Sequence, residues 1–258
     1  MIRFVVAALL FAVPALAQTK TTNRGTPAPD TLDPQKTYEL CLDTARVYPE
    51  QGVEFAGKWV GLGGGEPAKH CQAVAMMGMR EYGEAAQRLE ELAQNSKRGN
   101  DVRAGMLAQA AQSWLLMEDY ERANAAQTAA LKLKPNDPKL LIDRALTLAE
   151  AKNYWEAITD LDASIAADPK SAEAYAFRAS AYRMVSEDEL AMDDADRALE
   201  IDSSNVSALL ERGILRRMKN DDKGARQDWL RILQLAPESD TAKVARANIE
   251  RLDVNPEK

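Results

Sequence analysis

The sequence predicts an all-α protein built from repeated helical hairpins, and three observations lead to this prediction. From residue 38 onward apolar residues recur at helical spacing, and no run of four to eight residues alternates as a half-buried strand would. Small residues recur in phase at an interval of 34 residues. Proline recurs in the same frame, at the point where the second helix of each unit would end.

Four sets of positions share the 34-residue interval. Two sets hold alanine or glycine, which lets the backbones of two helices cross closely. A third set holds proline in three units and serine in one, and proline ends a helix because it lacks an N–H and restricts the residue before it. The sets are Ala123, Ala157, Ala191 and Ala225; Ala111, Ala145, Ala179 and Gly213; Pro135, Pro169, Ser203 and Pro237; and Leu131, Ile165, Leu199 and Leu233.

This pattern resembles that of the tetratricopeptide repeat family. The matching units are residues 104–137, 138–171, 172–205 and 206–239. Tyr120 and Tyr154 begin aromatic-acidic-alanine stretches that look like the start of the family's second helix. The resemblance implies a right-handed α-α superhelix of about five to six hairpins, in which each unit mainly contacts its neighbours. The first helices of the hairpins are expected to line a concave groove.

The pattern is irregular before residue 104 and changes after residue 239. We expect residues 35–103 to form irregular hairpins of the same kind, because Ala85 repeats at Ala123 after 38 residues, with about four extra residues near 96–100. Residues 240–258 are expected to form a capping helix and tail. The apolar stripe of that helix consists of Ala242, Ala245, Ile249 and Leu252.

The first residues predict export. Arg3 provides a positive charge, residues 4–13 are apolar, and residues 15–17 read Ala-Leu-Ala, a small-x-small cleavage site. The apolar run is too short to cross a bilayer, which needs ~20 residues. We therefore expect residues 1–17 to be a cleaved signal peptide and the Thr-, Pro- and Asn-containing residues 18–34 to form a flexible linker. The mature chain should lie in the periplasm, without stable membrane insertion, or be secreted if the source is not a Gram-negative bacterium.

Charge and cysteine content narrow the class of function. The formal net charge of −7 argues against nucleic acid as a partner, because such binding needs Lys and Arg to neutralise phosphates. Two cysteines in an exported chain predict a disulfide, Cys41–Cys71. Together with the single histidine, His70, they fall short of the about four ligands of a zinc site, so neither a metal nor a cofactor is expected. No nucleophile has an evident base beside it, and we predict that the chain is not an enzyme.

Arginine and aspartate also follow the period. In each of three units an arginine precedes an aspartate by sixteen residues, and in an antiparallel hairpin these two positions can face each other. We interpret them as structural ion pairs rather than acid-base or metal sites, because they repeat in register. The predicted pairs are Arg144–Asp160, Arg178–Asp194 and Arg212–Asp228.

The resemblance also places a partner-binding groove. Family members that clamp a terminal carboxylate carry lysine at the fifth position of a unit, whereas this chain has Ala108, Ile142, Ala176 and Leu210 there, so no such clamp is expected. An apolar stripe remains that suits an apolar partner segment, and methionine adapts to varied shapes. The predicted groove residues are Ile142, Leu146, Arg183, Met184, Leu210, Ile214, Arg217 and Met218. For each apolar member, packing inside the array is an equally open alternative.

We therefore predict a non-enzymatic scaffold or adaptor in the cell envelope that holds a protein or peptide segment in its groove. Two alternatives stand beside it: a self-associating repeat protein that acts as an assembly platform, and a carboxylate-based envelope enzyme. The mass in solution would reveal the self-associating protein. An Asp/Glu pair in a closed cleft would indicate the enzyme. Trp155 is predicted either to contact a partner or to pack on the preceding repeat.

Overall fold

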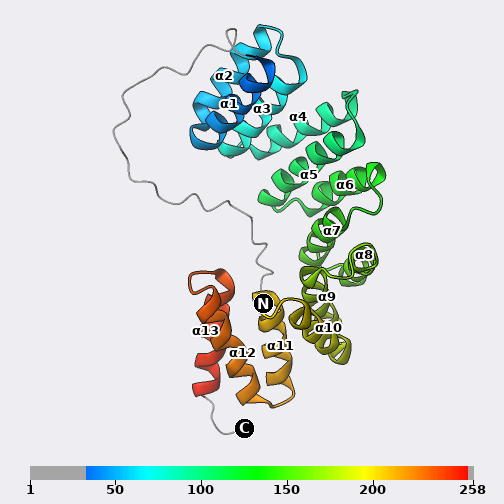
Figure 1. Cartoon of the computed structure of the whole chain (residues 1–258), viewed down its shortest axis with the longest axis vertical. Helices are drawn as coiled ribbons and strands as arrows, with labels where there is room; N and C mark the ends of the chain where they lie inside the picture. The colour runs from blue at the N-terminus through cyan, green and yellow to red at the C-terminus, as the bar shows by residue number, and fades with distance from the viewer. Residues whose placement is uncertain (1–32, 255–258) are drawn as a thin grey trace, which may run out of the picture. The chain divides into compact units, whose positions relative to one another are not determined.

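The computed structural model describes residues 33–254, and these residues contain thirteen α-helices and no strand. Consecutive helices pair as hairpins, so the predicted all-α helical-repeat fold is confirmed (Figure 1). The described residues fall into two compact units, 33–135 and 136–254. The predicted signal peptide and all but the last two residues of the predicted linker lie outside the described residues.

The N-terminal unit contains three hairpins. Asp33 accepts hydrogen bonds from the backbone N–H groups of Gln35 and Lys36, and Pro34 occupies the first helical position, so Asp-Pro fixes where the first helix begins. The five-helix run after it starts with a second proline, Pro49. The helices are α1 (Pro34–Val47), α2 (Pro49–Gly61), α3 (Gly65–Gly78), α4 (Tyr82–Asn95), α5 (Asn100–Leu116) and α6 (Tyr120–Leu133).

The C-terminal unit contains three further hairpins and a final helix. That final helix, α13, packs Ala242, Ala245 and Leu252 against the last hairpin and so covers its end. None of the helices within residues 33–254 has the length and apolar character needed to cross a bilayer. The helices are α7 (Pro138–Glu150), α8 (Tyr154–Ala167), α9 (Ala172–Met184), α10 (Asp188–Ile201), α11 (Val206–Met218), α12 (Asp222–Leu235) and α13 (Asp240–Val254).

The turns inside five of the six described hairpins, all but that between α1 and α2, share one backbone conformation. The second residue after each of α3, α5, α7, α9 and α11 lies in the left-handed region, and the next N–H donates to a carbonyl five residues back, which satisfies a carbonyl at the end of the helix. In α5, for example, the Asp119 N–H donates to the Trp114 carbonyl over 3.0 Å. The left-handed residues are Arg80, Glu118, Lys152, Ser186 and Asn220.

The small residues of the repeat lie at the helix crossings. All four alanines of the later set, from Ala123 to Ala225, are fully buried. Gly213 replaces alanine in the last hairpin because a Cβ there would lie only 2.8 Å from Cδ1 and 2.9 Å from Cε2 of Trp229. The four extra residues near 96–100 form a loop and lengthen α5, which begins at Asn100.

Candidate interaction surfaces

The predicted groove lies on the first helices of the C-terminal hairpins. We call the surface of α7, α9 and α11, which pack in that order, the A-helix face. Ile142 does not contribute to it, because only 6 % of the residue is exposed and it belongs to a core cluster of its own unit. For this residue packing inside the array is the correct alternative. Leu146 is half-buried against the same core cluster as Ile142. Leu210 and Ile214 are half-buried against a second core cluster of this unit.

Met184 and Met218 are the predicted groove residues that remain open to solvent. They end the adjacent helices α9 and α11, with exposed fractions of 37 % and 51 %. Trp155, at the start of α8, is 57 % exposed. The other tryptophans, Trp59, Trp114 and Trp229, are buried.

The two arginines predicted for the groove form ion pairs inside the array. Arg183 donates to Glu211 through Nε over 2.6 Å and through Nη2 over 3.3 Å, which joins α9 to α11. Both side chains are almost buried. Burial alone would lower the pKa of Arg183, but its hydrogen bonds to Glu211 and the charge of that carboxylate raise it. Arg217 Nη1 pairs with Asp222 over 2.6 Å, and both of these side chains are partly exposed.

Asp143 is a partly buried carboxyl on α7. Burial raises the pKa of this α7 carboxyl to about 6; the charge of Lys139 opposes that rise, while Glu173 and Asp137 add to it. Lys139 and Glu173 are exposed nearby. The face therefore gains negative charge as the pH rises through about 6.

The three predicted arginine–aspartate pairs all form. Each arginine donates through Nε and Nη2 to both carboxylate oxygens of its aspartate, with N–O distances from 2.6 to 3.0 Å. Such two-point pairing is geometrically specific and stronger than a single hydrogen bond. The aspartates Asp160, Asp194 and Asp228 are buried, so each pair fastens the two helices of its own hairpin.

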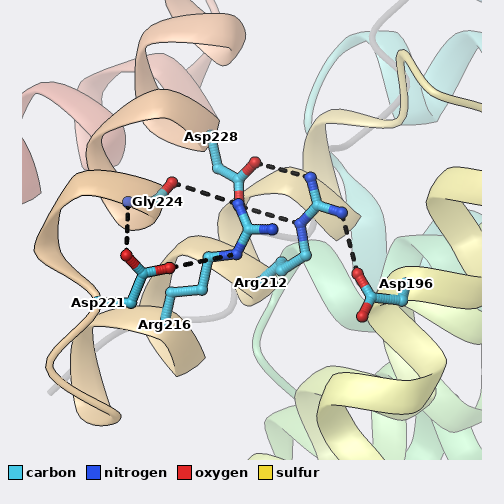
Figure 2. A network of polar contacts seen from close by, with 6 residues as sticks. All are labelled: Asp196, Arg212, Arg216, Asp221, Gly224 and Asp228. Atoms are coloured by element: carbon cyan, nitrogen blue, oxygen red, sulfur yellow. Dashed lines mark hydrogen bonds and ion pairs between the residues drawn. The ribbon is translucent and has the colours of Figure 1, made fainter.

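Two of these arginines also reach the preceding hairpin, which the sequence reasoning missed. Arg178 Nη1 donates to Asp162 over 2.6 Å, and Arg212 Nη1 donates to Asp196 over 2.9 Å. Figure 2 shows Arg212 between Asp196 and Asp228, with Arg216 donating to Asp228 as well, over 2.8 Å. A signal was available, because residues 162 and 196 are themselves 34 apart. We call this set of contacts the arginine ladder.

The N-terminal unit holds the predicted disulfide and an unpredicted cavity. Cys41 and Cys71 are bonded and fully buried, and they join α1 to α3 with a Cα–Cα distance of 6.2 Å. Beside them the Tyr38 hydroxyl lies 2.8 Å from His70 Nδ1, and His70 Nε2 lies 2.8 Å from Gln109 Oε1. This chain of hydrogen bonds links α1, α3 and α5 along a cavity of about 200 Å³.

His70 is the one histidine of the chain, and sequence reasoning considered it only as a zinc ligand or catalytic base. Burial lowers its pKa, and the charge of Arg98 adds to that effect, while the hydrogen bond with Gln109 and the charge of Glu66 act in the opposite direction. The residue is therefore neutral at pH 7. Within residues 33–254 no three His, Cys, Asp or Glu side chains are grouped as metal ligands would be.

Comparison with known proteins identifies the repeat. Residues 113–181 match the family profile described as tetratricopeptide repeat. The chain therefore contains tetratricopeptide repeats, identified over residues 113–181. A search of curated proteins found no match.

Several solved structures resemble this chain in fold. PilF of Pseudomonas aeruginosa has a TM-score of 0.63 and 18 % identity, covering 86 % of this chain and 99 % of PilF. MamA of Desulfovibrio magneticus RS-1 has a TM-score of 0.57 and 24 % identity, covering 68 % and 97 %. YrrB, described as a TPR protein with an unusual peptide-binding site, has a TM-score of 0.56 and 19 % identity, covering 72 % and 97 %. At these identities the likeness shows a shared fold.

Proposed function

We propose that this chain is a non-enzymatic scaffold of the cell envelope that holds a segment of a partner protein on its A-helix face. The observation that carries the proposal is the pair of exposed methionines, Met184 and Met218, on the adjacent helices α9 and α11. Methionine is flexible and polarisable, and it suits surfaces that accept apolar segments of varied shape. The half-buried Leu210 and Ile214 add apolar surface on α11.

The charged groups of the same region support binding rather than catalysis. Arg183 is held by Glu211, Arg217 by Asp222, and the aspartates of the arginine ladder by arginines. Groups that are tied to each other are poorly placed to transfer protons to a substrate. They fix the spacing of the helices instead, and a rigid face loses little conformational entropy when a partner binds.

Export is the second part of the proposal. Arg3, the apolar residues 4–13 and the Ala-Leu-Ala of residues 15–17 support a signal peptide. The Cys41–Cys71 disulfide fits an oxidising compartment, where such bonds persist. Fractionation of the native cells and sequencing of the mature N-terminus would test this directly. A chain that starts at Met1 and stays in the cytoplasm would contradict export.

The binding surface is tested by a charge placed on each exposed methionine. The protein is crosslinked in its native cells, its partner is identified, and the purified partner is titrated against the wild type and the double variant Met184→Asp and Met218→Asp. Both sites are exposed, so the helical circular dichroism should be unchanged, while affinity should fall at least tenfold. Binding should depend weakly on salt and show a negative heat-capacity change.

Leu190→Asp is the matched control, because Leu190 is 46 % exposed on α10, a second helix of its hairpin. It should leave affinity unchanged. If Leu190→Asp removes binding and the methionine variant does not, the partner sits on the second helices. If the protein binds only its own copies, as a larger mass in solution would show, it is an assembly platform instead.

A further inference from the structure

The cavity of the N-terminal unit has no role in the proposed function, and its lining contains the hydrogen-bonded side chains of Tyr38, His70 and Gln109. Its volume of about 200 Å³ is below the ~300 Å³ at which sites for drug-sized ligands begin. It therefore fits one side chain rather than a cofactor. Its lining includes the apolar residues Pro67, Val102 and Met106 and the polar residues Tyr38, His70 and Gln109.

The polar lining offers one hydrogen-bond donor and one acceptor to a ligand. The Gln109 carbonyl oxygen faces His70 Nε2, so Nε2 carries the proton and Nδ1 accepts from the Tyr38 hydroxyl. Among the described residues no group bonds the Gln109 amide N–H₂, and none donates to the Tyr38 oxygen. Turning the Gln109 amide over exchanges the roles along the chain of hydrogen bonds, yet one donor and one acceptor still remain.

The charges at the cavity rim are already paired with protein groups. Glu66 accepts from the Ser96 hydroxyl over 2.8 Å and lies 3.7 Å from the Arg98 guanidinium. Asp101 forms an ion pair with Lys134 over 3.0 Å. Each carboxylate of the lining therefore has a cation beside it. A neutral ligand enters such a site without leaving a charge unpaired.

Gly105 keeps one side of the cavity open. It lies inside α5 and lines the cavity, and a Cβ there would meet no atom within 4 Å. Glycine weakens a helix interior relative to alanine, and it is used where a ligand approaches the backbone closely. The open space beside Gly105 means that a larger residue can be added there without disturbing the packing of the unit.

We propose that this cavity binds the neutral carboxamide of a glutamine or asparagine side chain from a bound polypeptide. A carboxamide has both an N–H₂ donor for the Tyr38 oxygen and a carbonyl acceptor for the Gln109 N–H₂. The methylene groups of the ligand contact Pro67, Val102 and Met106. The site is separate from the A-helix face, so it stands or falls independently of the proposed function.

Because His70 is the one histidine, its imidazole gives an unambiguous NMR signal in the full-length protein. The probe is N-acetylglutamine methylamide, titrated into protein that carries ¹⁵N-labelled histidine. The His70 Nε2 signal should shift and saturate. The glutamate and lysine analogues should each bind at least fivefold more weakly, and N-acetylalanine methylamide, which has the same backbone amides and no carboxamide side chain, should not saturate.

Gly105→Leu fills the cavity and should abolish the shift. Gly57→Leu is the matched control, because Gly57 is also an exposed glycine inside a helix with no atom within 4 Å of a Cβ, and it does not line the cavity. It should retain the shift. If Gly105→Leu loses its helical circular dichroism, Val102→Trp at the partly exposed rim serves instead.

Four results would overturn the assignment. Stronger binding of the glutamate analogue would make the cavity an anion site at Arg98, and stronger binding of the lysine analogue a cation site at Glu66. Equal binding of the alanine analogue would assign the interaction to backbone amides. A shift that survives both cavity-filling variants would place the ligand elsewhere.

Discussion

Arg178 of the arginine ladder forms one ion pair within its own hairpin and one with the preceding hairpin, so variants at this site can compare the energies of the two pairs. Its Nε and Nη2 donate to the buried Asp194 over 2.7 and 2.8 Å, and its Nη1 donates to Asp162, which is half exposed. Its guanidinium also lies over the rings of Tyr175 and Tyr182, 5.5 and 5.7 Å from their centroids. Arg178→Met removes the charge and keeps most of the stem that packs there.

The Arg178–Asp194 and Arg178–Asp162 pairs should contribute differently to the free energy of unfolding. Removing one member of a buried pair typically costs about 3–5 kcal/mol, because the other charge is left without a partner, whereas an exposed pair contributes about 0–1 kcal/mol. Asp194 retains a little solvent contact, so we expect Arg178→Met to lower the free energy of unfolding by about 2–4 kcal/mol. Asp162→Ala should lower it by less than about 1 kcal/mol.

Urea denaturation followed by circular dichroism measures both variants, with Asp194→Ala added to close a double-mutant cycle. The cycle should give a coupling energy of about 1–3 kcal/mol between Arg178 and Asp194. The corresponding cycle with Asp162 should give less than about 0.5 kcal/mol. Additive losses for Arg178 and Asp194, or an Asp162 coupling as large as theirs, would refute the assignment of the Arg178–Asp194 pair as the stronger one.

Three further predictions concern the two units separately. Replacing Cys41 and Cys71 by alanine removes a disulfide that spans 30 residues, and it should lower the free energy of unfolding of the N-terminal unit, measured in urea, by about 3–4 kcal/mol. Two free thiols in protein taken from its native compartment would contradict the disulfide. Burial holds the pKa of His70 below its ordinary value of 6.5, so the unfolded chain takes up the proton at a higher pH than the folded chain does. The free energy of unfolding should therefore be constant just above pH 6.5 and decline below it. The difference in the free energy of unfolding between the wild type and His70→Gln should isolate that decline. Gly213→Ala should lower the melting temperature and cost about 1–3 kcal/mol, because its Cβ would overlap the Trp229 indole; a neutral effect would mean that the indole moves freely.

The period of 34 residues predicted the hairpins and the contacts inside them because a hairpin of fixed length sets which positions face each other. Arg178 and Asp194 are sixteen residues apart in one hairpin, and no tertiary information is needed to pair them. The contact from Arg178 to Asp162 depends on how one hairpin rotates against the next, which the period does not specify. The same limit hid the Arg183–Glu211 pair between α9 and α11.

The cavity of the N-terminal unit was beyond sequence reasoning for a further reason. Its lining comes from α1, α3, α5 and the loop at residues 96–99, a region where the repeat is irregular and no frame relates one hairpin to the next. The loop supplies Arg98 and Ser96, which hold Glu66 at the rim. A regular repeat would lack that loop. The departure from the period thus marks the part of the chain where a site specific to this protein can form. The regular hairpins instead repeat the same contacts from one unit to the next.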